Sequence, residues 1–154
     1  MSHNVEIELT KTTIDTTRAL EAVATERAGA VLLFLGTTRK VTAGRETASL
    51  DYTAYEPMAR AQMEKLAAEA MARWPIEHVA ITHRIGHLEV GEVSVAIALS
   101  APHRAEGFSA GQWLIDTLKE RVPIWKRENW ADGQSEWVHP GLTDLPRTDQ
   151  QRVE

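Results

Sequence analysis

One continuous apolar run limits the folds available to this chain. Residues 30–35 read AVLLFL, without the alternation of a strand that has one face in water. Such a run is typical of a strand buried on both faces of a sheet. Because helices cover the faces of a buried sheet, we expect the rest of the chain to supply covering helices.

Alternating apolar and polar residues predict further strands. Val5, Ile7 and Leu9 alternate with polar residues, and similar patterns recur after each helical segment. Glycines 86 and 91 are expected to mark a turn between two of the strands. The predicted strands are residues 5–9, 30–35, 49–55, 79–85 and 93–99, followed by a hairpin of residues 124–130 and 135–138 that turns at Asp132-Gly133.

Three segments have apolar residues at helical spacing. The first follows Asp15, contains Leu20, Ala24 and Ala28, and is expected to end at Gly29. The second starts near Pro57, and its apolar stripe is Met63, Leu66, Ala67, Ala70, Met71 and Trp74. The third runs from about Arg104 to Arg121, before Pro123, with an expected stripe of Phe108, Gly111, Ile115, Leu118 and Val122.

These segments predict an α+β domain. We expect a mixed or antiparallel sheet, two to three covering helices and a small C-terminal β-hairpin subdomain. Residues 1–139 are predicted to form a single domain, and residues 140–154 a polar C-terminal tail. The N-terminal residues have neither the basic nor the apolar region of a signal peptide, so the expected location is the cytoplasm.

Charge and cysteine content exclude several classes of function. The chain has 17 Lys and Arg against 22 Asp and Glu, a net charge of −5, which argues against nucleic-acid or membrane binding. It has no cysteine, which excludes disulfides, thiolate metal sites and a thiol nucleophile. If the reaction involves sulfur, another molecule must supply it.

Two lysines lie where apolar residues are expected. Lys119 falls within the stripe of the third helix, and Lys126 shares the parity of Ile124 on the following strand. Partial burial would favour the uncharged amine that a nucleophile or base requires. The alternatives are that the Lys119 stem covers apolar surface while its ammonium reaches water, and that Lys126 is a surface lysine.

Two basic segments suit an anion. His103 and Arg104 follow a buried strand where the third helix is expected to begin, and a helix N-terminus attracts phosphate or carboxylate groups. Arg39 follows the apolar strand in the loop GTTR, at a strand end where open sheets often bind ligands. Each of these residues taken alone is more often an ordinary surface or hydrogen-bonding residue.

His83 and His87 are candidates for a metal site, but their spacing brings two ligands together only on a helix, and Gly86 interrupts a helix. A hydrogen-bonded strand histidine is the favoured interpretation of His83. Four of the five tryptophans lie in the last third of the chain, where they suit core or interface packing.

Four motifs taken together resemble the large, catalytic subunit of molybdopterin synthase. They occur in the order of that family and extend over about residues 5–138. H-R-I-G, S-x-x-H-R and L-K-x-x-x-P-x-W-K are specific in combination, although each alone is weak. The runs are FLGTTR (34–39), YEPMA (55–59), HRIGHLEVGEVSVAIALSAPHR (83–104) and LKERVPIWKRE (118–128).

The resemblance implies an α/β hammerhead fold and a sulfurtransferase. Such an enzyme converts cyclic pyranopterin monophosphate into molybdopterin by installing two dithiolene sulfurs. The sulfur comes from the C-terminal Gly-Gly thiocarboxylate of a small ubiquitin-like subunit, whose tail enters the large subunit. The family pattern also implies a heterotetramer built on a dimer of large subunits. We expect neither a bound metal nor a cofactor.

The resemblance also implies roles for individual residues. Lys119 matches the essential amine at the donor's C-terminus, acting as acid/base or by transient bonding to the acyl carbon, and Lys126 matches a lysine that assists charge stabilisation and proton transfer. Arg39, His103 and Arg104 match positions that hold the substrate phosphate and pterin. Phe34 matches a residue of the pocket wall.

Two positions depart from the family pattern. Thr38 replaces an aliphatic residue, with little expected effect on the chemistry. After Trp137 the chain reads VHPGL, without the arginine expected to reach the neighbouring subunit's site, and Arg147 is a candidate substitute.

Two other functions remain open from the residues alone. One is a Schiff-base lysine enzyme acting on a phosphorylated carbonyl compound. The other is a non-catalytic module that docks a partner's C-terminal carboxylate in the same pocket.

Overall fold

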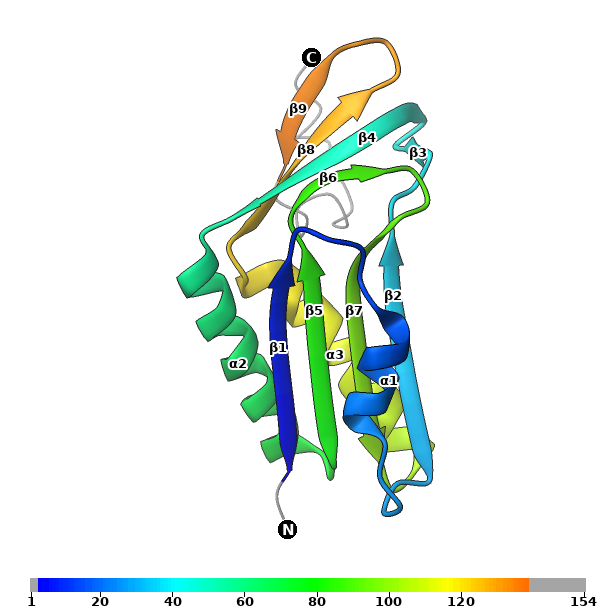
Figure 1. The fold of residues 1–154 in the computed structure, drawn as a ribbon, viewed down its shortest axis with the longest axis vertical. Helices are drawn as coiled ribbons and strands as arrows, with labels where there is room; N and C mark the ends of the chain where they lie inside the picture. Colours follow the sequence, from blue (N-terminus) through cyan, green and yellow to red (C-terminus); the bar gives the residue numbers. More distant parts are fainter. Residues whose placement is uncertain (1–2, 139–154) are drawn as a thin grey trace, which may run out of the picture.

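The structure, a computed structural model, describes residues 3–138 and places their strands in two sheets. In the first sheet the strand order is β1-β5-β7-β2, and only the β1–β5 pair is parallel. Figure 1 shows this sheet with its strands side by side. Its strands are β1 (Asn4–Thr10), β5 (His78–Arg84), β7 (Val93–Ala101) and β2 (Ala30–Thr37).

The second sheet lies across the end of the first (Figure 1). Its order is β3-β4-β8-β9, with β6 also paired to β4. The β8–β9 pair is the predicted C-terminal hairpin. The strands are β3 (Val41–Thr42), β4 (Arg45–Ala54), β6 (Gly86–Glu89), β8 (Ile124–Trp130) and β9 (Ser135–Val138).

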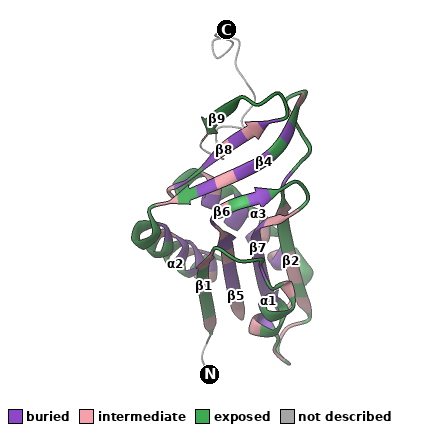
Figure 2. Cartoon of the chain, turned by 45° about the horizontal axis from the view of Figure 1, so that its top comes forward, coloured by how far each residue is buried: buried purple, intermediate pink, exposed green. Residues whose placement is uncertain are grey.

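Helices cover the first sheet on both faces, as expected. The prediction that the apolar run itself is buried on both faces is wrong: the run forms β2, an edge strand whose only neighbour among the described strands of the sheet is β7, and Val31, Phe34 and Leu35 are exposed. Helix α1 (Thr16–Val23) packs against β5 and β7, and helices α2 (Glu56–Arg73) and α3 (Arg104–Arg121) pack together on the opposite face. In Figure 2, β5 and β7 are largely buried, whereas β1 and β2 at the sheet edges are more exposed. The prediction of an α+β fold with a mixed sheet and covering helices is confirmed.

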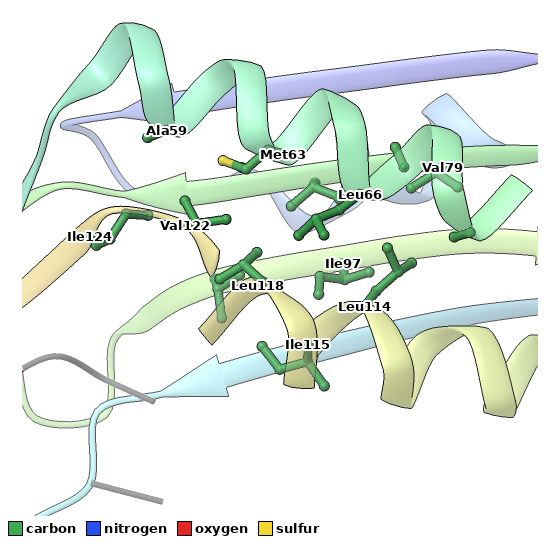
Figure 3. Packing of buried hydrophobic residues seen from close by; sticks show 14 of the residues in the cluster. Ala59, Met63, Leu66, Val79, Ile97, Leu114, Ile115, Leu118, Val122 and Ile124 are labelled. Carbon is green, nitrogen blue, oxygen red and sulfur yellow. The ribbon is translucent and has the colours of Figure 1, made fainter. Parts of the chain in front are cut away.

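The main core lies between the first sheet and the pair α2 and α3 (Figure 3). The predicted stripe of α2 faces this core: four of its residues are buried, and Met71 and Trp74 are partly buried. Val79, Ile81 and Ile97 provide the sheet side. The buried residues of the α2 stripe are Met63, Leu66, Ala67 and Ala70.

The structure corrects two helix predictions. Helix α1 ends at Val23 rather than at Gly29, and its buried residues are Ala19 and Val23 while Leu20 is 40% exposed. The face that α1 turns towards the sheet is set by its docking on β5 and β7, which local spacing does not encode.

The third helix begins and ends where predicted, and Ile115, Leu118 and Val122 of its stripe are buried as expected, but the stripe is wrong at Phe108. Phe108 is 65% exposed, whereas Gly107, Ala110 and Leu114 are buried. A β-carbon added at Gly107 would lie 2.8 Å from Leu32 Cδ1, so β2 passes too close there for a larger side chain. Contact with β2 therefore decides the buried face of α3.

Strand pairing also differs from the expectation of one sheet with a small hairpin. The segment predicted as strand 49–55 belongs to β4, which pairs with β8 and β6 in the second sheet. The short strands β3 and β6 replace a predicted loop and turn.

The predicted tail at 140–154, including Arg147, lies outside the described residues. Within residues 3–138, no helix combines the length and the apolar character needed to cross a membrane.

Replacing Leu66 by alanine is expected to lower the free energy of unfolding by about 3 kcal/mol, because the side chain is fully buried between α2 and the sheet. Chemical denaturation measures this difference. The matched variant Leu20→Ala, on an exposed position of α1, should change stability by less than about 0.5 kcal/mol. Equal losses in the two variants would contradict this assignment of the core.

Candidate functional site

A cavity of about 330 Å³ lies where the two sheets meet the C-terminal half of α3. Residues of β2, β4, β5, β7 and β8 line it, together with the last turns of α3. The structure brings four of the predicted site residues to this one cavity: Phe34, Arg39, Lys119 and Lys126. It therefore joins chain segments that are far apart in the sequence.

The end of β2 supplies Phe34 and Arg39. The register of β2 against β7 shifts between Gly36 and Thr37, and such a bulge redirects the chain at the end of a strand. A β-carbon added at Gly36 would lie 2.6 Å from Val95 Cγ1, so glycine allows the close approach of the two strands there. Phe34 is 39% exposed, and Arg39 is an exposed residue at the rim of the cavity.

Lys126 is held on the inward face of β8 by strand alternation. Ile124, Lys126 and Glu128 are all buried, and Lys126 is only 7% exposed. Its Nζ lies 3.6 Å from Glu128 Oε2, and Thr47 Oγ1 donates a hydrogen bond of 2.5 Å to Glu128 Oε1. A buried carboxylate therefore neighbours the buried ammonium and is itself oriented by a hydroxyl from β4.

Lys119 enters the cavity from the last turn of α3. It is half-buried, beside the buried Ile115 and Leu118. A cation at this end of a helix is also favoured by the helix dipole. The stem thus packs along apolar surface while the amine reaches the cavity.

His103 and Arg104 lie at the other end of α3. Arg104 is its first residue and His103 its N-cap, as predicted, and both are exposed. With a rise of about 1.5 Å per residue, Arg104 lies roughly 22 Å along the helix from Lys119. Neither residue lines the cavity of its own chain.

His83 lies in the cavity, whereas His87 lies on the outer face of the second sheet. Tyr52 lines the cavity, and its neighbour Asp51 on β4 accepts a hydrogen bond from His87 Nδ1 at 3.0 Å, on the opposite face. Within residues 3–138, no cluster of three or more metal-ligating side chains is found. The two histidines therefore do not share a site.

Three cavity residues were missed by the sequence reasoning: Tyr52, Glu128, and His83 as a cavity residue. Glu128 had a detectable signal, because it shares the parity of Ile124 and Lys126 on β8. His83 likewise shares the parity of Val79 and Ile81 on β5, but its contact with Tyr52 had no signal, since it depends on the position of the second sheet against β5. Their rings pack edge to face with centroids 5.1 Å apart.

Burial lowers the pKa of His83 to about 4, partly offset by a hydrogen bond to the Arg84 carbonyl. The unfolded chain binds a proton at this residue below about pH 6.5, while the folded protein does not do so until about pH 4. Stability should therefore fall as the pH falls between these values. We expect His83 to account for a loss of roughly 2 kcal/mol between pH 7 and pH 4.5.

Urea unfolding of the unaltered protein and of His83→Asn, each at pH 7 and at pH 4.5, measures the part of the stability loss that is due to His83. The loss on acidification should be smaller in the variant by that amount. A loss of the same size in both proteins would show that His83 does not contribute to it.

Residues 9–121 match the family model described as MoaE protein. The chain belongs to the MoaE family. The molybdopterin synthase catalytic subunit of Bacillus subtilis strain 168 is 44% identical over 131 residues, 85% of this chain and 83% of the relative. The catalytic subunit of Nostoc sp. PCC 7120 is 47% identical over 127 residues, 81% of this chain and 77% of the relative.

Solved structures of MoaE relatives have the same fold. Molybdopterin synthase from Staphylococcus aureus is 37% identical with a TM-score of 0.81, and the match covers 90% of this chain and 98% of that chain. A complex of subunits 1 and 2 of the molybdopterin-converting factor of Helicobacter pylori contains a chain 20% identical with a TM-score of 0.69, covering 86% of this chain and 88% of that one. The resemblance drawn from the sequence motifs is thus confirmed.

Proposed function

We propose that this chain is the catalytic subunit of a molybdopterin synthase. It transfers two sulfurs from the thiocarboxylated C-terminus of a small ubiquitin-like subunit to cyclic pyranopterin monophosphate. Membership of the MoaE family supports this function. The observation that carries it is the cavity in which Lys119, Lys126 and Arg39 meet in a chain without cysteine.

Cationic side chains in a partly closed cavity suit chemistry on a thiocarboxylate. The thiocarboxylate sulfur attacks a substrate carbon and displaces an oxygen substituent from it. Water then adds to the acyl carbon, the acyl carbon–sulfur bond breaks, and the carrier is left with a carboxylate. Negative charge develops on the acyl oxygen during this second step. Lys119 is placed to stabilise that charge, since a preorganised cationic donor favours a developing oxyanion.

Lys126 supports the same step from β8. Its ammonium lies beside Glu128, which fixes its position and balances its charge. We infer that Lys126 stabilises charge and assists proton transfer, as the family resemblance implies.

The substrate is recognised through its phosphate and its ring. Arg39 presents a guanidinium that can bind a phosphate through two N–H groups, and Phe34 offers an aromatic wall at the same end of β2. A cavity of about 330 Å³ is at the small end of ligand sites, which suits a small heterocycle and the narrow end of a carrier tail.

We infer that the chain acts as a dimer, because His103 and Arg104 do not reach the cavity of their own chain. Strand β2 is an edge of the first sheet and has an exposed apolar surface: Val31 is 49% exposed, and Phe108 of the adjacent α3 is 65% exposed. An unpaired apolar edge strand is a natural surface for pairing with another copy.

Antiparallel pairing of two β2 strands about a two-fold axis would bring the missing residues to the cavity. The N-terminal end of β2 lies beside the start of α3, where Gly29 N–H donates a 3.2 Å hydrogen bond to the Pro102 carbonyl. Antiparallel pairing sets this end of one strand beside Phe34 in the other copy. His103 and Arg104 of one copy would then serve the cavity of its partner.

Mixing two inactive variants tests this arrangement. In a 1:1 mixture of Lys119→Ala and Arg104→Ala that exchanges subunits, half of the dimers are mixed and each holds one intact site. Activity should recover to about a quarter of that of the unaltered protein. If Arg104 instead serves its own chain's cavity, every site lacks one residue, and the mixture stays as inactive as the separate variants.

The reaction itself is tested with purified components. The chain is incubated with cyclic pyranopterin monophosphate and thiocarboxylated small subunit, and molybdopterin is measured. We expect product with this carrier and none with the carboxylate form. Absence of product while the carrier is bound would favour the docking module, and borohydride trapping of a sugar phosphate would favour the Schiff-base enzyme.

A further inference from the structure

The cavity contains a buried imidazole, that of His83, which has no role in the reaction steps proposed above. It lies at the carboxyl end of β5, on the same face of the sheet as Val79 and Ile81, and is 4% exposed. In the sheet it is in register with Val95, another residue of the cavity wall. Tyr52 packs against the imidazole from the second sheet. Contacts from both sheets therefore hold the ring in place.

The hydrogen bonding of His83 determines which ring nitrogen carries a lone pair. Nδ1 lies 2.7 Å from the carbonyl oxygen of Arg84, and a carbonyl only accepts, so Nδ1 carries the proton. In the neutral ring Nε2 is then an acceptor. Within residues 3–138, Nε2 has no hydrogen-bond partner. Burial lowers the pKa of the ring to about 4, so this acceptor is present at neutral pH.

The other polar groups of the cavity serve less well as proton acceptors. A protonated lysine and an arginine only donate hydrogen bonds. Glu128 already accepts from Thr47 and neighbours Lys126. Ser94 donates its hydroxyl to the Gly36 carbonyl, and hydroxyls are weak bases. Among these groups, His83 offers a basic lone pair that the described protein leaves open.

The proposed reaction includes a step that needs such an acceptor. Once the thiocarboxylate sulfur has bonded to the substrate carbon, the carrier remains attached through an acyl–sulfur bond. Water must add its oxygen to the acyl carbon, and a proton must reach the sulfur as the carbon–sulfur bond breaks. Atoms balance without an oxidant or reductant: the products are a carrier carboxyl group and a substrate thiol.

We propose that His83 is a catalytic residue for this hydrolysis. Its Nε2 accepts a proton from the attacking water as the carbon–oxygen bond forms, and returns it to the sulfur as the carbon–sulfur bond breaks. A weakly basic, buried imidazole suits the second half of this exchange, because once protonated it is a strong proton donor. The inference rests on the proposed function and adds a residue to it.

Two variants of His83 test the roles of Nδ1 and Nε2 separately. In His83→Asn the side-chain amide can still donate to the Arg84 carbonyl, but nothing replaces Nε2. In His83→Gln a polar atom lies near the position of Nε2 without its basicity. His87→Asn, on the outer face of the second sheet, is the matched control. Unfolding midpoints at pH 7 identify any variant that does not fold.

A single-turnover experiment gives the deciding measurement. Samples are quenched in acid, and intact-mass spectrometry follows the carrier, the carrier–substrate adduct and the free carrier carboxylate. In both His83 variants we expect the adduct to form within about threefold of the normal rate and to decay at least about 100-fold more slowly. Hydroxylamine, which attacks acyl–sulfur bonds without a base, should release the carrier from the accumulated adduct.

Other outcomes would overturn the proposal. Adduct decay at the normal rate in either folded variant would show that His83 does not activate water. Slower formation and decay by the same factor would show a structural role. If the unaltered protein forms neither adduct nor product, the proposed function itself fails, which is a separate result from the failure of His83.

Discussion

Replacing Lys119 by alanine is expected to lower the rate of molybdopterin formation by about 100- to 1000-fold, the usual effect of removing one donor to a developing oxyanion. The side chain enters the cavity from the last turn of α3, and its removal leaves the buried neighbours Ile115 and Leu118 in place. The fold should therefore be kept. Product formation from cyclic pyranopterin monophosphate and thiocarboxylated carrier measures the effect.

Lys65→Ala is the matched control for this experiment, because Lys65 is an exposed residue of α2 that does not line the cavity. Its activity should equal that of the unaltered protein. Carrier binding to Lys119→Ala should persist, which separates loss of chemistry from loss of docking. Activity above a tenth of normal in Lys119→Ala would remove this lysine from the centre of the mechanism.

Replacing Glu128 by alanine is expected to affect both stability and activity. Glu128 is 2% exposed, and its loss leaves the buried Lys126 ammonium without the carboxylate 3.6 Å away. Breaking a buried ion pair on one side costs about 3 kcal/mol of unfolding free energy. Because Lys126 then loses a contact that positions it, we also expect product formation to fall by at least about tenfold.

The variant Glu128→Gln removes the negative charge of this side chain but keeps its shape. Its amide oxygen can still accept the hydrogen bond from Thr47, and its volume is nearly unchanged. Glu128→Gln should be more stable than Glu128→Ala. Its rate of product formation should still be lower than that of the unaltered protein, because the negative charge beside Lys126 is missing. Urea denaturation and the product assay measure the two effects. Equal stability of Glu128→Ala and the unaltered protein would contradict the role of this pair.

The effects at Lys126 and Glu128 could be anticipated in part from the sequence. Alternation along residues 124–130 predicts that Lys126 faces inward, and the structure shows Lys126 and Glu128 buried on that face. Alternation is a property of every extended strand, so it can be read without knowing the partner strands. The presence of Thr47 beside Glu128 could not be read in this way, because β4 and β8 are distant in the sequence.

The buried faces of the helices were also predicted only in part. The stripe of α2 is confirmed because its apolar residues lie on one face over about three turns, and this face packs into the main core. The stripe of α3 was misjudged at Phe108, because Gly107 and Ala110 present a small-residue face on which β2 and β7 approach closely. Small residues give little local signal of burial.

The sequence by itself determined the order of the helices and of the longer strands, the presence of covering helices and, through its motifs, the family, while it left open whether Lys126 faces inward or lies at the surface. These follow from local periodicity and from residue types at fixed spacing. Only the tertiary structure decided that β4 and β8 form a second sheet, that the apolar strand β2 lies at a sheet edge, and that His83 and Tyr52 meet in the cavity. Pairing between distant segments depends on the fit between whole surfaces. The local pattern of apolar residues shows which face of an element is buried, but it does not specify the element that packs against that face.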